Sequence, residues 1–142
     1  MIYYDMKKKC PVEEHKPKHA RHPCEVSGSK RDGYELRGRI WVEGKDGTFL
    51  GYGRVVLLER IKQYGSITMA AKSMEMSYRA AWELVESMNR QAKSPLVETA
   101  TGGKGGGGAR LTKAGERAIE AFWRFYERFK EFLKKEIRNF TL

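Results

Sequence analysis

The chain has 142 residues, a formal net charge of +10 and a pI near 9.7. This length suits one domain with extensions around a single modest core, and the charge favours a polyanionic partner, nucleic acid before membrane. No uninterrupted apolar run is long enough to span a bilayer. The basic N-terminal cluster is not followed by the apolar stretch of a signal peptide, and two cysteines without a disulfide framework indicate the cytoplasm.

Residues 1–33 are expected to form an arm outside the core. They contain three of the four prolines, all three histidines and both cysteines, but few large apolar side chains. Such a segment buries too little apolar surface to fold alone. It is therefore interpreted either as an arm or as a loop that a ligand stabilises.

Every cysteine and histidine of the chain lies between Cys10 and Cys24. His19 and His22 are spaced to share one helical face, and Cys10 and Cys24 can complete a tetrahedral zinc site with them. The spacing matches no standard zinc finger, so three interpretations stay open. The segment is a zinc site, a basic arm that touches the DNA backbone, or a redox-active pair of thiols.

From Tyr34 onward the pattern predicts a β-ribbon. YELRGRIWVEG is typical of a strand, Asp46-Gly47 of a turn, and TFLG of a short second strand. The residues expected to face inward are Leu36, Ile40, Val42, Phe49 and Leu50.

Three helices are predicted next. Apolar residues at helical spacing indicate a helix over 52–64, which Gly65 ends. Ser66 is the expected N-cap of a second, short helix, and Ser77 that of a third helix that runs to about Gln91. The second and third helices and the turn between them form a helix-turn-helix pattern.

The third helix has a predicted core stripe of Ala81, Val85 (or Leu84) and Met88. Four residues near its N-terminus lie off this stripe or at its edge: Tyr78, Arg79, Trp82 and Glu83. The residues expected to contact DNA are Ser77, Tyr78, Arg79 and Trp82.

Each of these four residues has its own chemistry. Arg79 can contact guanine bidentately, and Ser77 or Tyr78 can bond a phosphate or a base edge. Trp82 has two open interpretations: it packs under the helix, or it contacts a thymine methyl group.

A basic, glycine-rich hairpin is predicted after Pro95. LVETA and ARL are its expected strands, and the glycines between them let the backbone approach a phosphate or the minor groove, where Lys104 adds charge. The run also matches G-x-G-x-x-G, but the preceding parallel strand of a dinucleotide site is missing, so nucleotide binding is disfavoured. No histidine or cysteine lies outside the arm, so a nucleophilic triad is excluded from the folded domain and no enzyme is expected.

Thr112 is expected to open a long last helix. Its apolar positions recur every three or four residues and form a seam longer than one small domain needs to cover, so part of the seam is expected to meet a second copy. The expected dimer contacts are Phe122, Tyr126, Phe129, Leu133 and Phe140.

GSITMAAKSMEMSYRAAWELVESMN, together with LVETATGGKGGGGARLT, closely resembles the N-terminal DNA-binding domain of the ModE family of bacterial molybdenum-responsive transcriptional regulators. The resemblance implies a homodimer on a palindromic operator of double-stranded DNA, with Ser77, Tyr78, Arg79 and Trp82 at the start of the recognition helix. The wing residues that it implies are Thr101, Gly102, Gly103, Lys104, Gly105 and Arg110. The oxyanion-binding domains of the family have no counterpart here, so a molybdate response is not carried over.

The sequence therefore predicts an α+β winged helix-turn-helix with an N-terminal β-ribbon and a long C-terminal dimerisation helix. The expected division is a basic arm over 1–33, a DNA-binding domain over 34–111 and a dimerisation helix over 112–142. The expected function is that of a sequence-specific transcriptional regulator. Two alternatives stay open, an architectural DNA binder with weak sequence preference and an interaction subunit whose basic surface meets an acidic partner.

Overall fold

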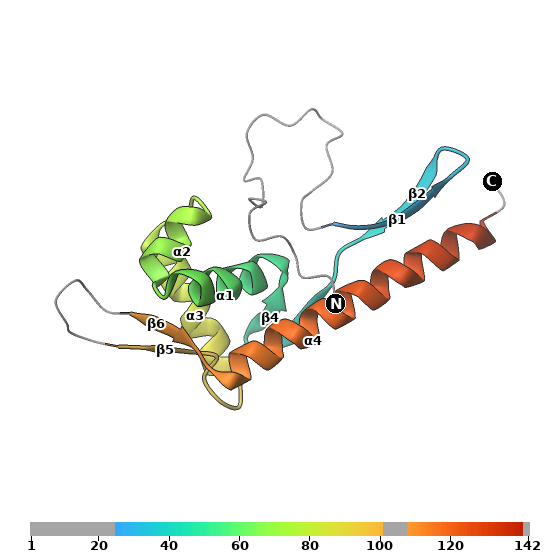
Figure 1. The fold of residues 1–142 in the computed structure, drawn as a ribbon. Helices are drawn as coiled ribbons and strands as arrows, with labels where there is room; N and C mark the ends of the chain where they lie inside the picture. Colours follow the sequence, from blue (N-terminus) through green and yellow to red (C-terminus); the bar gives the residue numbers. More distant parts are fainter. Residues whose placement is uncertain (1–24, 101–107, 141–142) are drawn as a thin grey trace.

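The computed structural model describes residues 25–100 and 108–140 (Figure 1). Within them, helices α1, α2 and α3 gather beside the β5–β6 ribbon at one end of the long helix α4, and the β1–β2 hairpin lies toward its other end. In chain order the elements are β1 (Val26–Arg31), β2 (Tyr34–Gly38), β3 (Trp41–Gly44), β4 (Gly47–Gly51), α1 (Tyr52–Tyr64), α2 (Ile67–Ser73), α3 (Tyr78–Gln91), β5 (Val97–Thr99), β6 (Ala109–Leu111), α4 (Lys113–Glu136) and the 3₁₀ turn η1 (Ile137–Asn139). The fold is an α+β winged helix-turn-helix, as the sequence predicts.

Helix α1 forms the centre of the core. It runs over the predicted residues and carries the fully buried cluster Val55–Leu58 together with Ile61. Gly65 ends the helix in the left-handed conformation, with φ of 65°, and its N–H donates to the carbonyl of Ile61 at 2.8 Å. This conformation favours glycine because it has no Cβ to clash.

Both predicted serine caps are confirmed. The Ser66 hydroxyl oxygen accepts from the N–H of Met69 at 3.2 Å and begins α2, and that of Ser77 accepts from Ala80 at 3.1 Å and begins α3. Each cap satisfies a backbone donor that the helix itself leaves free.

The core face of α3 is also as predicted. Ala81, Val85 and Met88 are buried, and Leu84 is only partly buried, so Val85 is the residue of that pair that belongs to the core stripe. This packing fixes which side of α3 remains in solvent.

The predicted ribbon is divided differently. The expected continuous strand from Tyr34 breaks at 39–40, so its first half pairs with β1 and its second half, β3, pairs with β4. Leu50 is buried as expected, but Val42 is 38% exposed and does not face the core. The register shift between Val42 and Glu43 interrupts the alternation of side chains on which the prediction relied.

Residues 25–33 differ from the unstructured arm expected there. Strand β1 begins at Val26 and pairs antiparallel with β2 around Asp32-Gly33, whose φ angles are 50° and 82°. Two consecutive left-handed residues are typical of a two-residue hairpin turn, and the Asp-Gly dipeptide is its usual sequence. That dipeptide was the signal for this hairpin.

The hairpin covers the distal half of α4. A Cβ at Gly28 would lie 2.9 Å from backbone atoms of Leu133 and Lys134, so β1 rests directly on the helix. Leu133 and Ile137 are 6% and 3% exposed. The β1–β2 hairpin of the same chain therefore buries part of the apolar face of α4.

Two of the expected dimer contacts are not on the surface. Phe122 is 1% exposed in the main core and Leu133 lies close to β1. Tyr126 and Phe129 are partly buried, and Phe140 is 44% exposed. The periodicity found the apolar face of α4 but could not distinguish cover by the hairpin from cover by a second copy.

Candidate nucleic-acid interface

The N-terminal end of α3 presents large side chains to solvent. Tyr78 and Trp82 are 53% and 43% exposed, and the side chain of Arg79 is 88% exposed. Tyr78 and Trp82 are four residues apart and therefore neighbours on one helical face. Of the two interpretations of Trp82, its exposure favours a side chain free to contact a ligand over one packed under the helix.

Ser77 has a capping role and still retains a donor. Its oxygen accepts from the N–H of Ala80, while the residue itself is exposed. A hydroxyl has one donor besides its acceptor lone pairs. Ser77 can therefore cap α3 and donate to a phosphate at the same time.

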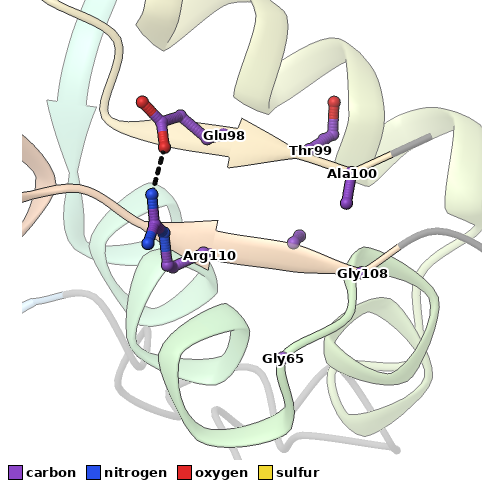
Figure 2. A pocket seen from close by; sticks show the side chains of 7 residues that line it. Gly65, Glu98, Thr99, Ala100, Gly108 and Arg110 are labelled. Atoms are coloured by element: carbon purple, nitrogen blue, oxygen red, sulfur yellow. Dashed lines mark hydrogen bonds and ion pairs between the residues drawn. The ribbon is translucent and has the colours of Figure 1, made fainter.

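The β5–β6 ribbon forms the root of the wing. Val97, Glu98 and Thr99 pair with Leu111, Arg110 and Ala109 in an antiparallel register. Arg110 is exposed, and its Nη2 donates to Oε2 of Glu98 across the strands at 2.6 Å (Figure 2). Thr101, Gly102, Gly103, Lys104 and Gly105, the expected tip contacts, lie outside the described residues.

A hollow of about 320 Å³ lies between the wing root and the turn that follows α1 (Figure 2). It is lined by Gly65, Glu98, Thr99, Ala100, Gly108, Ala109 and Arg110. Most of these residues have short side chains, and Glu98 and Arg110 are the charged members of the lining that the structure describes.

Asn89 fixes the wing to α3, a role that the sequence alone did not indicate. Its Oδ1 accepts from the N–H groups of Leu96 and Val97 at 2.8 and 3.1 Å, and its Nδ2 donates to the carbonyl of Val97 at 2.9 Å. One amide thus sets the start of β5 relative to the recognition helix. An asparagine near a helix end followed by Pro95 is too common a pattern to have indicated this role.

Two carboxylates form ion pairs with the expected DNA contacts, and these pairs were not predicted. Glu83 Oε1 lies 3.1 Å from the Nε of Arg79, one helical turn away, and Glu98 holds Arg110. Arg79 and Glu83 are four residues apart, which is the spacing of helical ion pairs, so the sequence alone could have predicted this pair.

A buried polar pair lies behind the helix-turn-helix. The indole N–H of Trp123 on α4 donates to Oε1 of Glu59 on α1, and Glu59 is 9% exposed. Burial raises the pKa of the Glu59 carboxyl, while the hydrogen bond from Trp123 and the charges of Arg60 and Lys62 oppose that rise. Burial likewise lowers the pKa of Arg54, whose Nη1 donates to Ser87 on α3 at 3.0 Å.

The residues predicted for zinc, Cys10, His19, His22 and Cys24, lie outside the described residues. Within 25–100 and 108–140 no group of three or more histidine, cysteine, aspartate or glutamate residues is placed to hold a metal ion. None of the helices in these ranges is long and apolar enough to cross a bilayer.

The helix-turn-helix region is similar to a known family of bacterial regulators. The family described as bacterial regulatory helix-turn-helix protein, lysR family, matches residues 53–116, which run from α1 through the wing into α4. This range contains both the exposed end of α3 and the ribbon that carries Arg110.

The chain is also similar to curated regulators. It is 49% identical over 69 residues to the transcriptional regulator ModE of Yersinia pestis and 48% identical over 69 residues to the DNA-binding transcriptional dual regulator ModE of Escherichia coli, covering 49% of this chain and 26% of each relative. It is 44% identical over 95 residues to the molybdenum-pterin-binding protein MopB of Rhodobacter capsulatus, covering 67% of this chain and 34% of that protein. The matches span about a quarter to a third of these relatives' lengths. Over the matched 69 to 95 residues the chain is therefore similar to ModE-type regulators.

Proposed function

We propose that this protein is a sequence-specific DNA-binding transcriptional regulator and not an enzyme. The observation that carries the proposal is the exposure of Tyr78, Arg79 and Trp82 at the start of α3, while Ala81 and Val85 hold the opposite face in the core. A helix held in this way presents donors and aromatic edges at the end that enters a major groove.

The wing and the charge support the same proposal. A net charge of +10 favours a polyanion, and Arg110 stands exposed on the ribbon beside the recognition helix. Lys104 is proposed to contact a phosphate at the wing tip, together with Thr101 and the neighbouring glycines. Contacts to phosphate fix the register of a protein on duplex DNA, while base contacts supply the specificity.

A homodimer on a palindromic operator is proposed as the assembly. The exposed aromatic residues of α4 support it: Phe125 and Phe132 are 43% and 53% exposed, seven residues apart, and Phe132 stacks on Phe129 with centroids 6.1 Å apart. Seven residues are two helical turns, so both side chains lie on one side of the helix. A cytoplasmic location is proposed with this function.

The test of the function is a ratio of affinities. The full chain is titrated with duplexes from the DNA upstream of its own gene and with random duplexes of equal length, at one fixed salt concentration. A regulator should bind its preferred site on the order of 10³-fold or more above non-specific DNA. A ratio near one would favour an architectural DNA binder, and the absence of binding would contradict both.

A further inference from the structure

Arg79, the most exposed arginine of the recognition helix α3, forms an ion pair with a carboxylate of the same helix. The Nε of Arg79 lies 3.1 Å from Oε1 of Glu83, four residues further along α3, and the two side chains are 88% and 59% exposed. Neither side chain is part of the packed core. The pair therefore has no evident role in stabilising the fold.

The geometry of this pair selects one edge of the guanidinium. Arginine has five N–H donors in a rigid planar fork, one on Nε and four on the two terminal nitrogens. Glu83 occupies the Nε–H of Arg79, and the pair of terminal nitrogens has no partner among residues 25–100 and 108–140. That pair is the edge that can bond O6 and N7 of one guanine end-on.

The same carboxylate restrains Arg79 in a second way. An arginine side chain loses rotamer entropy when it is fixed, and an exposed arginine near DNA can turn to a phosphate instead of a base. A negative charge beside Arg79 makes the nearest phosphates less favourable. Discrimination between partners commonly depends on such a repulsive element as well as on the attractive contact.

In solvent the pair itself is weak, because water screens exposed charges and both side chains lose entropy when they pair. Inside a groove that excludes water, the effective dielectric falls and the interaction strengthens. We propose that Glu83 is a positioning residue that aims Arg79 at guanine and thereby sets the base preference of the recognition helix. This inference rests on the proposed DNA-binding function and deepens it.

The experiment compares the full-chain wild type with Glu83→Ala and Glu83→Gln on a selected duplex and on the same duplex with the Arg79-dependent base pair replaced. Glu83→Ala should reduce discrimination between the two duplexes by about fivefold, the lower end of what one bidentate pair supplies. Glu83→Gln should retain most of the discrimination, because its amide oxygen can still accept from Nε of Arg79.

Two controls separate positioning from charge. Glu86 is another exposed carboxylate of α3, so Glu86→Ala removes the same charge without touching Arg79. Both alanine variants should bind every duplex more tightly at low salt, but only Glu83→Ala should lose discrimination. In the Arg79→Ala background, Glu83→Ala should leave discrimination unchanged, since the residue that it aims is gone.

Full discrimination in Glu83→Ala would overturn the inference and leave the proposed function intact. An equal loss of discrimination with and without Arg79 would also overturn it, because Glu83 would then read a base itself. A wild type that binds no duplex would instead overturn the proposed function, and this inference with it. Circular dichroism of each variant checks that α3 is retained.

Discussion

The backbone N–H of Ala109 donates to the carbonyl of Gly65 at 2.9 Å, which joins the root of the wing to the turn between α1 and α2. Gly65 ends α1 in the left-handed conformation, and Ser66 immediately after it caps α2. Gly65 therefore fixes the position of strand β6 relative to the helix-turn-helix. Asn89 makes the second connection, from α3 to the start of β5.

Gly65→Ala should lower the free energy of unfolding by about 1 kcal/mol, because a Cβ is disfavoured at positive φ. Denaturant unfolding measures this change. Gly53→Ala is the matched control: Gly53 lies within α1, a Cβ there meets nothing within 4 Å, and alanine should stabilise the helix by about 0.5 kcal/mol. Equal effects of the two substitutions would contradict the role given to Gly65.

Lys104→Ala should weaken binding to all duplexes alike and reduce the slope of log affinity against log salt by about one unit, since a phosphate contact releases a counterion without reading sequence. Titrations at several salt concentrations measure the slope. A loss confined to one operator position would instead make Lys104 a base reader.

Phe125→Ala combined with Phe132→Ala should convert the proposed dimer to a monomer. It should also weaken operator binding strongly, because two half-sites about 34 Å apart need two linked heads. Sedimentation of the dilute protein measures the assembly. Trp41→Ala removes an equally exposed aromatic residue from β3 and should leave the dimer intact. A wild type that sediments as a monomer would exclude the dimer.

Glu59→Gln tests the buried carboxyl. Burial raises the pKa of Glu59 in the folded state, so the folded protein holds this proton more tightly than the unfolded chain does. The resulting gain in folding free energy is complete below the ordinary pKa of 4.5 and is lost as the pH rises through the folded pKa. Glutamine is neutral throughout and retains an acceptor for the indole of Trp123. The variant should therefore be more stable than wild type at pH 7, and the difference should vanish below pH 4.5. Parallel stability profiles for the two proteins would contradict this account of Glu59.

The helices could be predicted from the sequence because their boundaries depend on local chemistry. Three helices begin at a residue whose side-chain oxygen accepts from the backbone N–H three positions later: Ser66, Ser77 and Thr112. Helix α1 ends at Gly65, which depends only on the positive φ of that glycine. The β1–β2 hairpin was missed although Asp32-Gly33 marks its turn, because its stability depends on α4, about one hundred residues away. Periodicity reports that a face is apolar but does not report what covers it.

Part of the candidate interface could also be predicted from the sequence, and part could not. The sequence identified the residues that point outward from α3, since the core stripe on the opposite face is a local pattern. It did not identify Asn89, whose partners lie in the next element, or the carboxylates that accompany Arg79 and Arg110. The contacts of Asn89 depend on how α3 and the ribbon are placed in three dimensions. Glu83, in contrast, follows Arg79 by four residues within α3, a spacing that the sequence does show.

The most direct test of the account is a selection from randomised duplex DNA with wild type and with Arg79→Ala, each sequenced to give a base preference at every position. Wild type should show a defined preferred site. The Arg79→Ala variant should lose preference at one guanine per half-site and about 1–3 kcal/mol of affinity for the preferred site. An unchanged preference profile in the variant would contradict base readout by Arg79, and the absence of any preference in wild type would contradict sequence-specific binding.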